Sequence, residues 1–398
     1  MAAGEPLSEA EIEYFEAAKK DYEELLAEVT IEYDKTEKVY ASLIAAQKLF
    51  VEKLNISVYS KDVVEKVQSD DADVLEAKKV LLQVIADFRS VERYFRVREY
   101  YGNAINNSYN KTFNPHAEIV KNDETDFSEF NYGNNDVTGP DADHGTHVSG
   151  IIAAEASANY KTRGISQKVK IMALRAVPNG DEHDKDIVAS IRYAVANGAK
   201  IINMSFGKAY SPYKAEIDKA FLMAAEKGVL IVHAAGNSSL NLDTANNFPN
   251  RKLVNGSVLS GPAEIGSWLE VGASGPNRGL DLLAVFSNYG SKSIDLFAPG
   301  VDILSSVTGH DYAMYSGTSM ASPVVAGSAA LLMNRHKGIT AKQTREIILD
   351  QVRTEYPRTR LPAPTKSYDI PVYLKSISIT GGLLDLNRST KLAEQLSP

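Results

Sequence analysis

Glycine is distributed so unevenly along this 398-residue chain that two kinds of structure must be joined in it. Of the 26 glycines, 25 lie after residue 100, as do 14 of the 15 prolines. Glycine and proline interrupt helices and form turns, so their near absence from residues 1–101 favours long helices there. Their abundance from residue 102 onward favours shorter elements joined by turns. The sequence therefore predicts two domains, residues 1–101 and residues 102–398.

The first region is predicted to be a helical hairpin or small bundle. Pro6 and a capping box formed by Ser8 and Glu11 place a helix start near Ser8. The Ser69–Asp71 run is typical of a solvated turn that begins a helix. Three apolar sets at helical spacing must be covered by partner helices. These sets are Phe15, Ala18, Tyr22, Leu25 and Val29; Val39, Leu43, Leu49, Phe50 and Leu54; and Val74, Leu81, Val84, Ile85, Phe88 and Val91.

Charge and composition exclude several classes of function. Residues 1–100 contain 22 acidic and 14 basic side chains and hold the whole net charge of −8, because the rest of the chain has 29 of each. A nucleic-acid-binding surface needs clustered Lys and Arg, so nucleic acid is not an expected partner. There is no apolar run of about 18 residues that could span a membrane. The absence of cysteine excludes disulfides, thiolate metal sites and a cysteine nucleophile.

From residue 102 onward, short apolar runs alternate with helical patterns. This alternation predicts an α/β fold with a mostly parallel sheet and helices on both faces. Helices are expected at Asp186–Asn197 and Tyr213–Lys227, ended by Gly198 and Gly228 respectively. In such folds, functional side chains gather at the carboxyl ends of the strands. The predicted strands are Ile171–Val177, Lys200–Met204, Val229–Ala234, Ser267–Gly272 and Ile294–Phe297.

Three segments carry side chains suited to nucleophilic chemistry. The first, Asp143–Gly150 (DHGTHVSG), places His144 at the start of an apolar helix. A histidine there can take up and return a proton near neutral pH. Two other interpretations stay open. His144 and His147 could be structural residues of a helix start, or they could be metal ligands, since their spacing places both rings on one helical face.

The second segment, Val232–Ser238, ends a predicted strand with Gly236 and Asn237. An asparagine at this point can donate a hydrogen bond to a developing oxyanion, while Gly236 lets a substrate approach the backbone. An ordinary turn is the alternative interpretation.

The third segment, Gly317–Gly327 (GTSMASPVVAG), opens a long apolar helix. Ser319 is expected near its N-terminus, where unpaired N–H groups and the helix dipole favour negative charge. Pro323 is expected to lie within the first turn. The alternative is a buried helix with a serine cap.

Taken in order, D-x-H-G-T-H-V-x-G, A-A-G-N and G-T-S-M-A-S-P resemble the motifs of the subtilases, the subtilisin-like serine peptidases. The resemblance covers about residues 103–393. It implies a subtilisin-like fold and peptide-bond hydrolysis, with His144 as general base, Ser319 as nucleophile and Asn237 as oxyanion donor. It also makes His147 a structural histidine.

The resemblance further implies a peptide-binding segment. The residues around Ser205, Phe206 and Gly207 are similar to the family's strand that pairs with an extended substrate, and Gly236 belongs to the same site. A polypeptide is the implied partner. No organic cofactor or catalytic metal is implied, although subtilases often hold structural calcium.

One part of the family pattern has no counterpart in the sequence. Subtilases carry the triad aspartate before the histidine motif, on a buried strand of the type V-A-V-I-D-[ST]-G. The nearest segment, Ile119–Asp123, has polar residues where apolar ones are needed. Asp136, Asp141 and Asp143 are so close to His144 in sequence that they are not expected to point at its ring.

A branch of bacterial subtilases has a long helical insert after the aspartate strand, and residues 1–101 resemble it. On this interpretation residues 102–398 are a peptidase domain that is incomplete on its N-terminal side, without its central aspartate-bearing strand. Unpaired backbone and weak residual activity are then expected. Members of the family are secreted or lie in the cell envelope. Met1–Pro6 does not resemble a signal peptide, so a chain beginning there should stay inside the cell.

Two other functions stay open beside that of a serine endopeptidase. One is a non-catalytic peptide-binding protein that keeps the groove at residues 205–207 without a working triad. The other is an intracellular esterase built on the same nucleophile.

Overall fold

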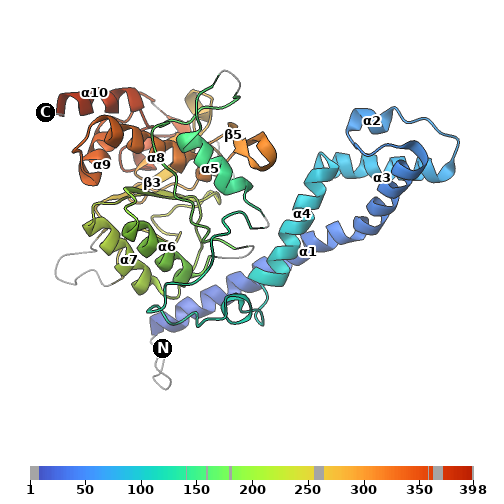
Figure 1. Ribbon diagram of the computed structural model, residues 1–398, viewed down its shortest axis with the longest axis horizontal. Coiled ribbons are helices and arrows are strands. Elements are labelled where there is room, and N and C mark those ends of the chain that lie inside the picture. The colour runs from blue at the N-terminus through green and yellow to red at the C-terminus, as the bar shows by residue number, and fades with distance from the viewer. Residues whose placement is uncertain are drawn as a thin grey trace. The chain divides into compact units, whose positions relative to one another are not determined.

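In the computed structural model, the chain forms two compact units that divide between Lys121 and Asn122. Each unit is described by itself, and the elements of both are drawn in Figure 1. The described residues are 9–139, 141–157, 160–178, 182–254, 264–356, 358–361 and 371–396.

The first unit is helical, as the sequence predicts. The helices α3 and α4 pack on the second half of α1 and bury the second and third apolar sets. Phe50, Leu81 and Tyr94 lie at the centre of this core. The Asp71 carboxylate caps α3 by accepting hydrogen bonds from two backbone N–H groups, so the predicted helix start is confirmed. The elements are α1 (Glu9–Leu54), α2 (Lys61–Glu65), α3 (Ala72–Phe88), α4 (Val91–Asn103), η1 (Ala104–Ser108) and η2 (His116–Val120).

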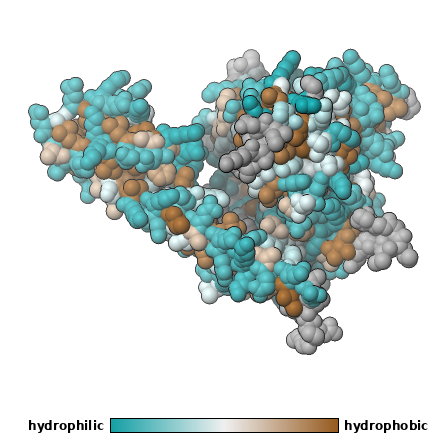
Figure 2. All heavy atoms as spheres, turned by 180° about the vertical axis from the view of Figure 1, so that it is seen from behind, coloured by the Kyte–Doolittle hydropathy of each residue, from teal (hydrophilic) through white to brown (hydrophobic). Residues whose placement is uncertain are grey.

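The first apolar set was wrongly expected to be covered by a partner helix. Phe15 is 59% exposed and Leu25 is 46% exposed. The reason is length, because α3 and α4 have 17 and 13 residues while α1 has 46, so the two shorter helices cover only part of it. Apolar residues accordingly appear between polar ones on the surface of this unit (Figure 2). The predicted cap Ser8 lies outside the described residues.

The second unit is built on a four-stranded parallel sheet of order β1-β2-β3-β4. Four of the five predicted strands are confirmed. Ile201 pairs with Leu230 and Val232 with Leu269, so neighbouring strands end at one edge. The strands are β1 (Ile201–Met204), β2 (Leu230–Ala234), β3 (Trp268–Ser274) and β4 (Leu296–Pro299).

Helices cover both faces of this sheet (Figure 1). On one face Ile231 joins the core formed with α6 and α7, and on the other Leu230 and Val232 join the core formed with α8 and α9. Gly198 and Gly228 follow α6 and α7 with positive φ, as the predicted helix ends require. The helices are α5 (Asp143–Ala153), α6 (Asp184–Ala196), α7 (Lys214–Glu226), α8 (Thr318–Arg335), α9 (Ala341–Asp350) and α10 (Leu386–Leu396).

Shorter elements complete the second unit. The strands β5 and β6 form an antiparallel hairpin, and β7 and β8 form a second antiparallel pair. No described helix is both long and apolar enough to cross a lipid bilayer. The elements are η3 (Gly279–Asp281), β5 (Ile303–Val307), η4 (Thr308–His310), β6 (Asp311–Tyr315), β7 (Thr359–Arg360), β8 (Pro371–Val372) and η6 (Leu374–Ser376).

The prediction of a buried strand at Ile171–Val177 was wrong. This segment has no regular secondary structure, and Ile171 and Leu174 are 43% and 37% exposed. A buried parallel strand needs neighbours that pair its backbone and elements that cover both faces. Within the described sheet, β1 pairs only with β2, and residues 171–177 do not pair with its free edge, so the segment has no partner strand there.

Candidate active site

The start of α8 carries the predicted nucleophile. Ser319 is the second residue of the helix and is half-buried. Its hydroxyl donates to the carbonyl oxygen of Ser205 at 3.1 Å, and the Ser205 hydroxyl donates to the carbonyl oxygen of Ser319 at 2.9 Å. The structure thus brings Ser319 together with the predicted peptide-binding segment.

Pro323 explains why the Ser319 carbonyl can accept this bond. The sequence places Pro323 in the first turn, but it is the sixth residue of α8, so that prediction was wrong. In an α-helix, the N–H of residue 323 would donate to the carbonyl of residue 319. Proline has no N–H, so the Ser319 carbonyl is available to the Ser205 hydroxyl.

A small polar network surrounds this contact. The Asn203 amide donates to the Ser205 hydroxyl at 3.1 Å, and the Ser322 hydroxyl donates to the Asn203 side-chain oxygen at 2.9 Å. The hydroxyl oxygens of Ser205 and Ser322 are 3.0 Å apart. Ser322 is fully buried and was not singled out from the sequence, although it is the second serine of the T-S-M-A-S-P motif.

Asn237 lies beside the same helix start, with its amide fixed in orientation. Its side-chain oxygen accepts hydrogen bonds from the Thr318 N–H at 2.8 Å and from the Thr318 hydroxyl at 2.9 Å. The Thr318 hydroxyl in turn accepts from the Gly236 N–H at 3.0 Å. The Asn237 residue is exposed, and its amide NH₂ makes no hydrogen bond within the described part of the chain. It is therefore an available donor next to Ser319.

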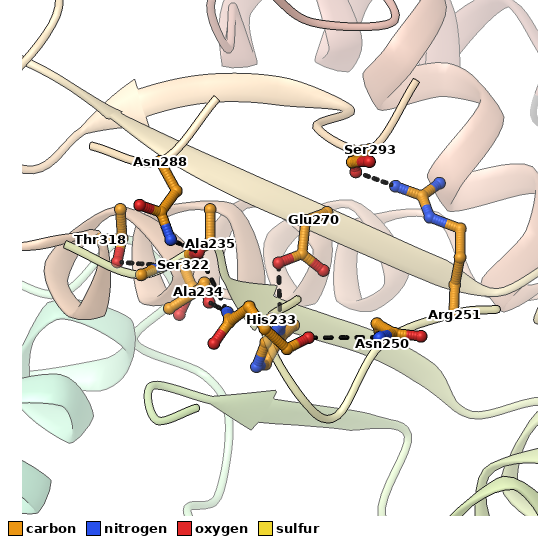
Figure 3. A network of polar contacts seen from close by, with 12 residues as sticks. His233, Ala234, Ala235, Asn250, Arg251, Glu270, Asn288, Ser293, Thr318 and Ser322 are labelled. Carbon is orange, nitrogen blue, oxygen red and sulfur yellow. Dashed lines mark hydrogen bonds and ion pairs between the residues drawn. The ribbon is translucent and has the colours of Figure 1, made fainter. Parts of the chain in front are cut away.

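Gly236 is required by geometry. Its φ is +97°, in the region that favours glycine, and a Cβ there would lie 2.6 Å from the amide nitrogen of Asn288. That amide donates to the Ala235 carbonyl at 2.7 Å (Figure 3). The Asn288 side-chain oxygen accepts from the Ser238 N–H at 3.1 Å. Asn288 therefore holds the turn that presents Asn237. No sequence motif indicated this role.

His144 lies in the first turn of α5 and is exposed. Its ring has no hydrogen bond or ion pair to any residue that the structure describes, so it is not joined to Ser319. Crowding by surrounding protein atoms lowers the pKa of His144 despite this exposure, and the charge of His147 lowers it further, whereas the charge of Asp141 opposes the shift. The imidazole is therefore neutral near pH 7, as a general base must be.

The helices that carry His144 and Ser319 pack against each other. Gly327 of α8 allows their close approach, because a Cβ there would lie 3.0 Å from the Cβ of Ile165 and 3.4 Å from the Cα of Ile152 in α5. The two side chains thus come from the N-terminal turns of packed helices.

The contacts of His147 are typical of a histidine with a structural role. It is fully buried, and its Nε2 lies 3.0 Å from the Ile303 carbonyl oxygen and 3.1 Å from the Ala313 carbonyl oxygen. The ring stacks on Tyr315 with centroids 4.4 Å apart. Across the described residues, no group of three or more His, Asp or Glu side chains could hold a metal ion.

The nearby aspartates are engaged in local structure. Asp123 and Asp136 each accept hydrogen bonds from the threonine two residues ahead, as is typical of turns. Asp143 accepts from the Thr308 N–H at 3.0 Å, and Asp141 accepts from the Asp143 N–H at 2.8 Å. Asp141 is the carboxylate whose charge acts on the His144 ring.

The predicted peptide-binding residues follow β1 at its carboxyl end. The Phe206 carbonyl accepts a hydrogen bond from His233 of β2 at 2.8 Å. A Cβ on Gly207 would lie 2.4 Å from the Asn247 side-chain oxygen. The Asn247 amide donates to the Ala234 and Ala235 carbonyls at 3.2 and 3.0 Å. The segments 205–207 and 234–236 thus lie beside each other, and we call them the two walls of the candidate peptide-binding site. Neither Asn247 nor His233 was found by sequence reasoning.

Comparisons with known proteins identify the family of the chain. Residues 56–368 match the family model described as the subtilase family. The chain belongs to this family.

Individual relatives are similar over about half of the chain. The thermophilic serine proteinase of Bacillus sp. (strain AK1) is 39% identical over 211 residues, which are 52% of this chain and 47% of that protein. The cell wall-associated protease of Bacillus subtilis (strain 168) is 35% identical over 233 residues, 58% of this chain and 24% of that protein. The chain therefore spans less than half the length of either relative.

Among solved structures, that of a cold adapted subtilisin-like serine proteinase is similar, with 26% identity and a TM-score of 0.44. The similarity covers 61% of this chain and 76% of that one.

Proposed function

We propose that this chain carries the catalytic machinery of a serine endopeptidase, with Ser319 as nucleophile, His144 as general base and Asn237 as oxyanion donor. The observation that carries the proposal is the double hydrogen bond from Thr318 to the Asn237 side-chain oxygen. It turns the amide NH₂ outward beside Ser319, where a donor can stabilise a tetrahedral intermediate without reorganising.

The proposed reaction begins when a peptide lies along Ser205–Gly207. The Ser319 hydroxyl turns from the Ser205 carbonyl toward His144, gives its proton to the imidazole and attacks the scissile carbonyl. The Asn237 amide and the Ser319 N–H donate to the oxyanion. The tetrahedral intermediate collapses as His144 returns the proton to the leaving amine, and water then hydrolyses the acyl-enzyme by the same route.

In this proposal, His144 works without the aspartate strand of the family pattern. Loss of that carboxylate in subtilisin costs about 3 × 10⁴ in kcat, which is less than loss of the serine or the histidine. We therefore expect slow hydrolysis by this chain.

We propose that residues 102–398 form the peptidase domain and that residues 1–101 are a helical insert. The match of the family model from residue 56 onward supports assigning part of the helical region to a subtilase. By analogy with the cell wall-associated relative, polypeptides outside the cell or in its envelope are the proposed substrates.

A specific observation favours a second candidate, a peptide-binding protein without catalysis. The Ser319 hydroxyl donates to the Ser205 carbonyl, and His144 has no hydrogen bond to a described residue. Such a protein would keep the walls at 205–207 and 234–236 and bind extended peptides without cleaving them.

Labelling by a fluorescent fluorophosphonate separates the two candidates. A peptidase should be labelled, Ser319→Ala should abolish labelling, and Asn237→Ala should slow peptide hydrolysis by about 10²–10³-fold, the range known for an oxyanion donor in subtilisin. Absence of labelling in folded protein that still binds a fluorescent peptide would favour the non-catalytic function. Cleavage of small esters but not of peptides would indicate an esterase.

A further inference from the structure

A buried ionisable pair lies directly beneath the proposed peptide-binding walls. His233 of β2 is completely buried, and Glu270, its partner in register on β3, is 4% exposed. Nδ1 of His233 lies 2.9 Å from Oε1 of Glu270 (Figure 3). Its Nε2 lies 2.8 Å from the Phe206 carbonyl oxygen. The proposed mechanism uses neither side chain.

The two partners of the His233 ring are both acceptors. A neutral imidazole has one N–H, so it can donate to only one of them, whereas an imidazolium donates to both. Glu270 is suited to balance this charge, because its second oxygen accepts from the Trp268 indole N–H at 2.7 Å. Hydrogen bonds of this kind favour an ionised carboxylate.

Other charges on the packed elements support an ionised Glu270. Asp295 accepts from the Arg251 guanidinium at 3.0 and 2.7 Å, from Arg345 at 3.2 Å and from the Glu270 N–H at 2.7 Å. Two cations therefore face one carboxylate next to Glu270. The excess positive charge favours an ionised Glu270.

We propose that His233, held as an imidazolium by Glu270, is a positioning residue that fixes the Phe206 carbonyl and thereby the peptide-binding segment Ser205–Gly207. The inference rests on the proposed function for its role in substrate binding. The hydrogen bonds from a charged His233 to Glu270 and Phe206 do not depend on the proposed function.

The direction of the Phe206 carbonyl matters because successive carbonyls of an extended chain point to opposite sides. When the Phe206 carbonyl is held toward β2, the Ser205 carbonyl is expected to face the other way. The Ser205 carbonyl does face the Ser319 hydroxyl. The His233 bond thus presents the neighbouring backbone groups to a peptide.

Two substitutions at one position separate the two hydrogen bonds. In His233→Gln, the amide nitrogen can occupy the place of Nε2 and donate to Phe206. In His233→Asn, the shorter side chain can reach only toward Glu270. We expect the Asn variant to increase hydrogen exchange of the backbone amides in residues 205–208 and to weaken binding of a fluorescein-labelled tetrapeptide amide about tenfold, the loss expected for one hydrogen bond. The Gln variant should stay within about twofold of the wild type in both measurements.

The protonation state is read separately by nitrogen-resolved NMR of the full chain. The wild type should show two N–H signals for the His233 ring. Glu270→Gln should show one, because its amide can donate to Nδ1 and leave a neutral ring that still donates to Phe206. One signal in the wild type would overturn the imidazolium assignment.

Equal exchange at residues 205–208 in the Asn and Gln variants would overturn the positioning role. Exchange and NMR need no substrate, so a wild type that neither binds the tetrapeptide nor reacts with fluorophosphonate would count against the proposed function alone. If the Asn variant fails to fold, the Gln variant and the wild-type NMR spectrum still test the inference. Increased hydrogen exchange at residues 205–208 in the Gln variant would contradict it.

Discussion

Ser205 and Ser319 are joined by two reciprocal hydrogen bonds, each from the hydroxyl of one residue to the backbone carbonyl of the other, at 2.9 and 3.1 Å. The residues are 114 positions apart in the sequence, at the end of β1 and the start of α8. The contact fixes the proposed nucleophile against the proposed peptide-binding segment. It depends on Pro323, which leaves the Ser319 carbonyl without a donor from its own helix.

This dependence predicts a coupled effect of Ser205→Ala and Pro323→Ala. Ser205→Ala alone leaves the Ser319 carbonyl without its donor and should lower the free energy of unfolding by about 1–3 kcal/mol. In a Pro323→Ala background the cost should be much smaller, because the new N–H of residue 323 can donate to that carbonyl. A double-mutant cycle in urea measures this, and equal costs in the two backgrounds would contradict it.

A second prediction concerns the Thr318 hydroxyl, which connects Asn237 and Gly236. Thr318→Val removes one of the two donors to the Asn237 oxygen and the acceptor of the Gly236 N–H, so only the Thr318 N–H still holds the amide. Fluorophosphonate labelling of Ser319 should slow about tenfold, the effect of roughly one hydrogen bond. Thr318→Ser keeps the hydroxyl and should label at nearly the wild-type rate. Equal rates in the Val and Ser variants would show that the hydroxyl has no such role.

A third prediction tests the packing of α5 on α8. Gly327→Ala places a methyl group 3.0 Å from the Cβ of Ile165 and 3.4 Å from the Cα of Ile152 in α5, so α5 and the segment that carries Ile165 must shift away from α8. We expect a loss of about 1–3 kcal/mol in the free energy of unfolding, together with slower labelling. Gly266→Ala is the matched control, since a Cβ there meets no atom within 4 Å. An unchanged Gly327→Ala protein would mean that the helices are not closely packed at this point.

The fourth prediction concerns pH. Because the pKa of His144 is lowered from its ordinary value of about 6.5, its neutral form persists to lower pH than that of an unperturbed histidine. The labelling rate should therefore fall to half its maximum below about pH 6.5. Asp141→Asn removes the charge that raises this pKa and should move the midpoint to still lower pH. Asp136→Asn, in a separate turn, should leave it unchanged. A midpoint that rises in Asp141→Asn would contradict the electrostatic assignment.

The fifth prediction follows from the exposure of residues 171–177. Ile171→Thr should change the free energy of unfolding by less than about 0.5 kcal/mol, because the side chain is 43% exposed and outside the sheet. Ile231→Thr, at a fully buried position of β2, should cost about 2–4 kcal/mol through lost burial and an introduced hydroxyl. Similar large losses at both positions would show that residues 171–177 are buried in solution.

Local patterns in the sequence determined most of the fold. The period of the apolar residues and the glycines after α6 and α7 predicted these helices, and short apolar runs predicted the strands β1 to β4. Such signals depend on neighbours in the chain, so they can be read without knowing the tertiary structure. The apolar run at 171–177 gave a wrong prediction, because a buried strand depends on a partner strand that the run itself does not specify.

The motifs predicted Ser319, Asn237 and His144 as candidate residues, but only the tertiary structure decided what each one contacts. The sequence by itself determined which side chains with suitable chemistry stand at the ends of which elements. The structure decided that Thr318 holds the Asn237 amide, that Ser205 meets the carbonyl left unpaired by Pro323, and that His233 and Glu270 lie beneath the walls. These contacts join residues tens of positions apart, and their geometry depends on how the sheet and helices pack rather than on any local pattern.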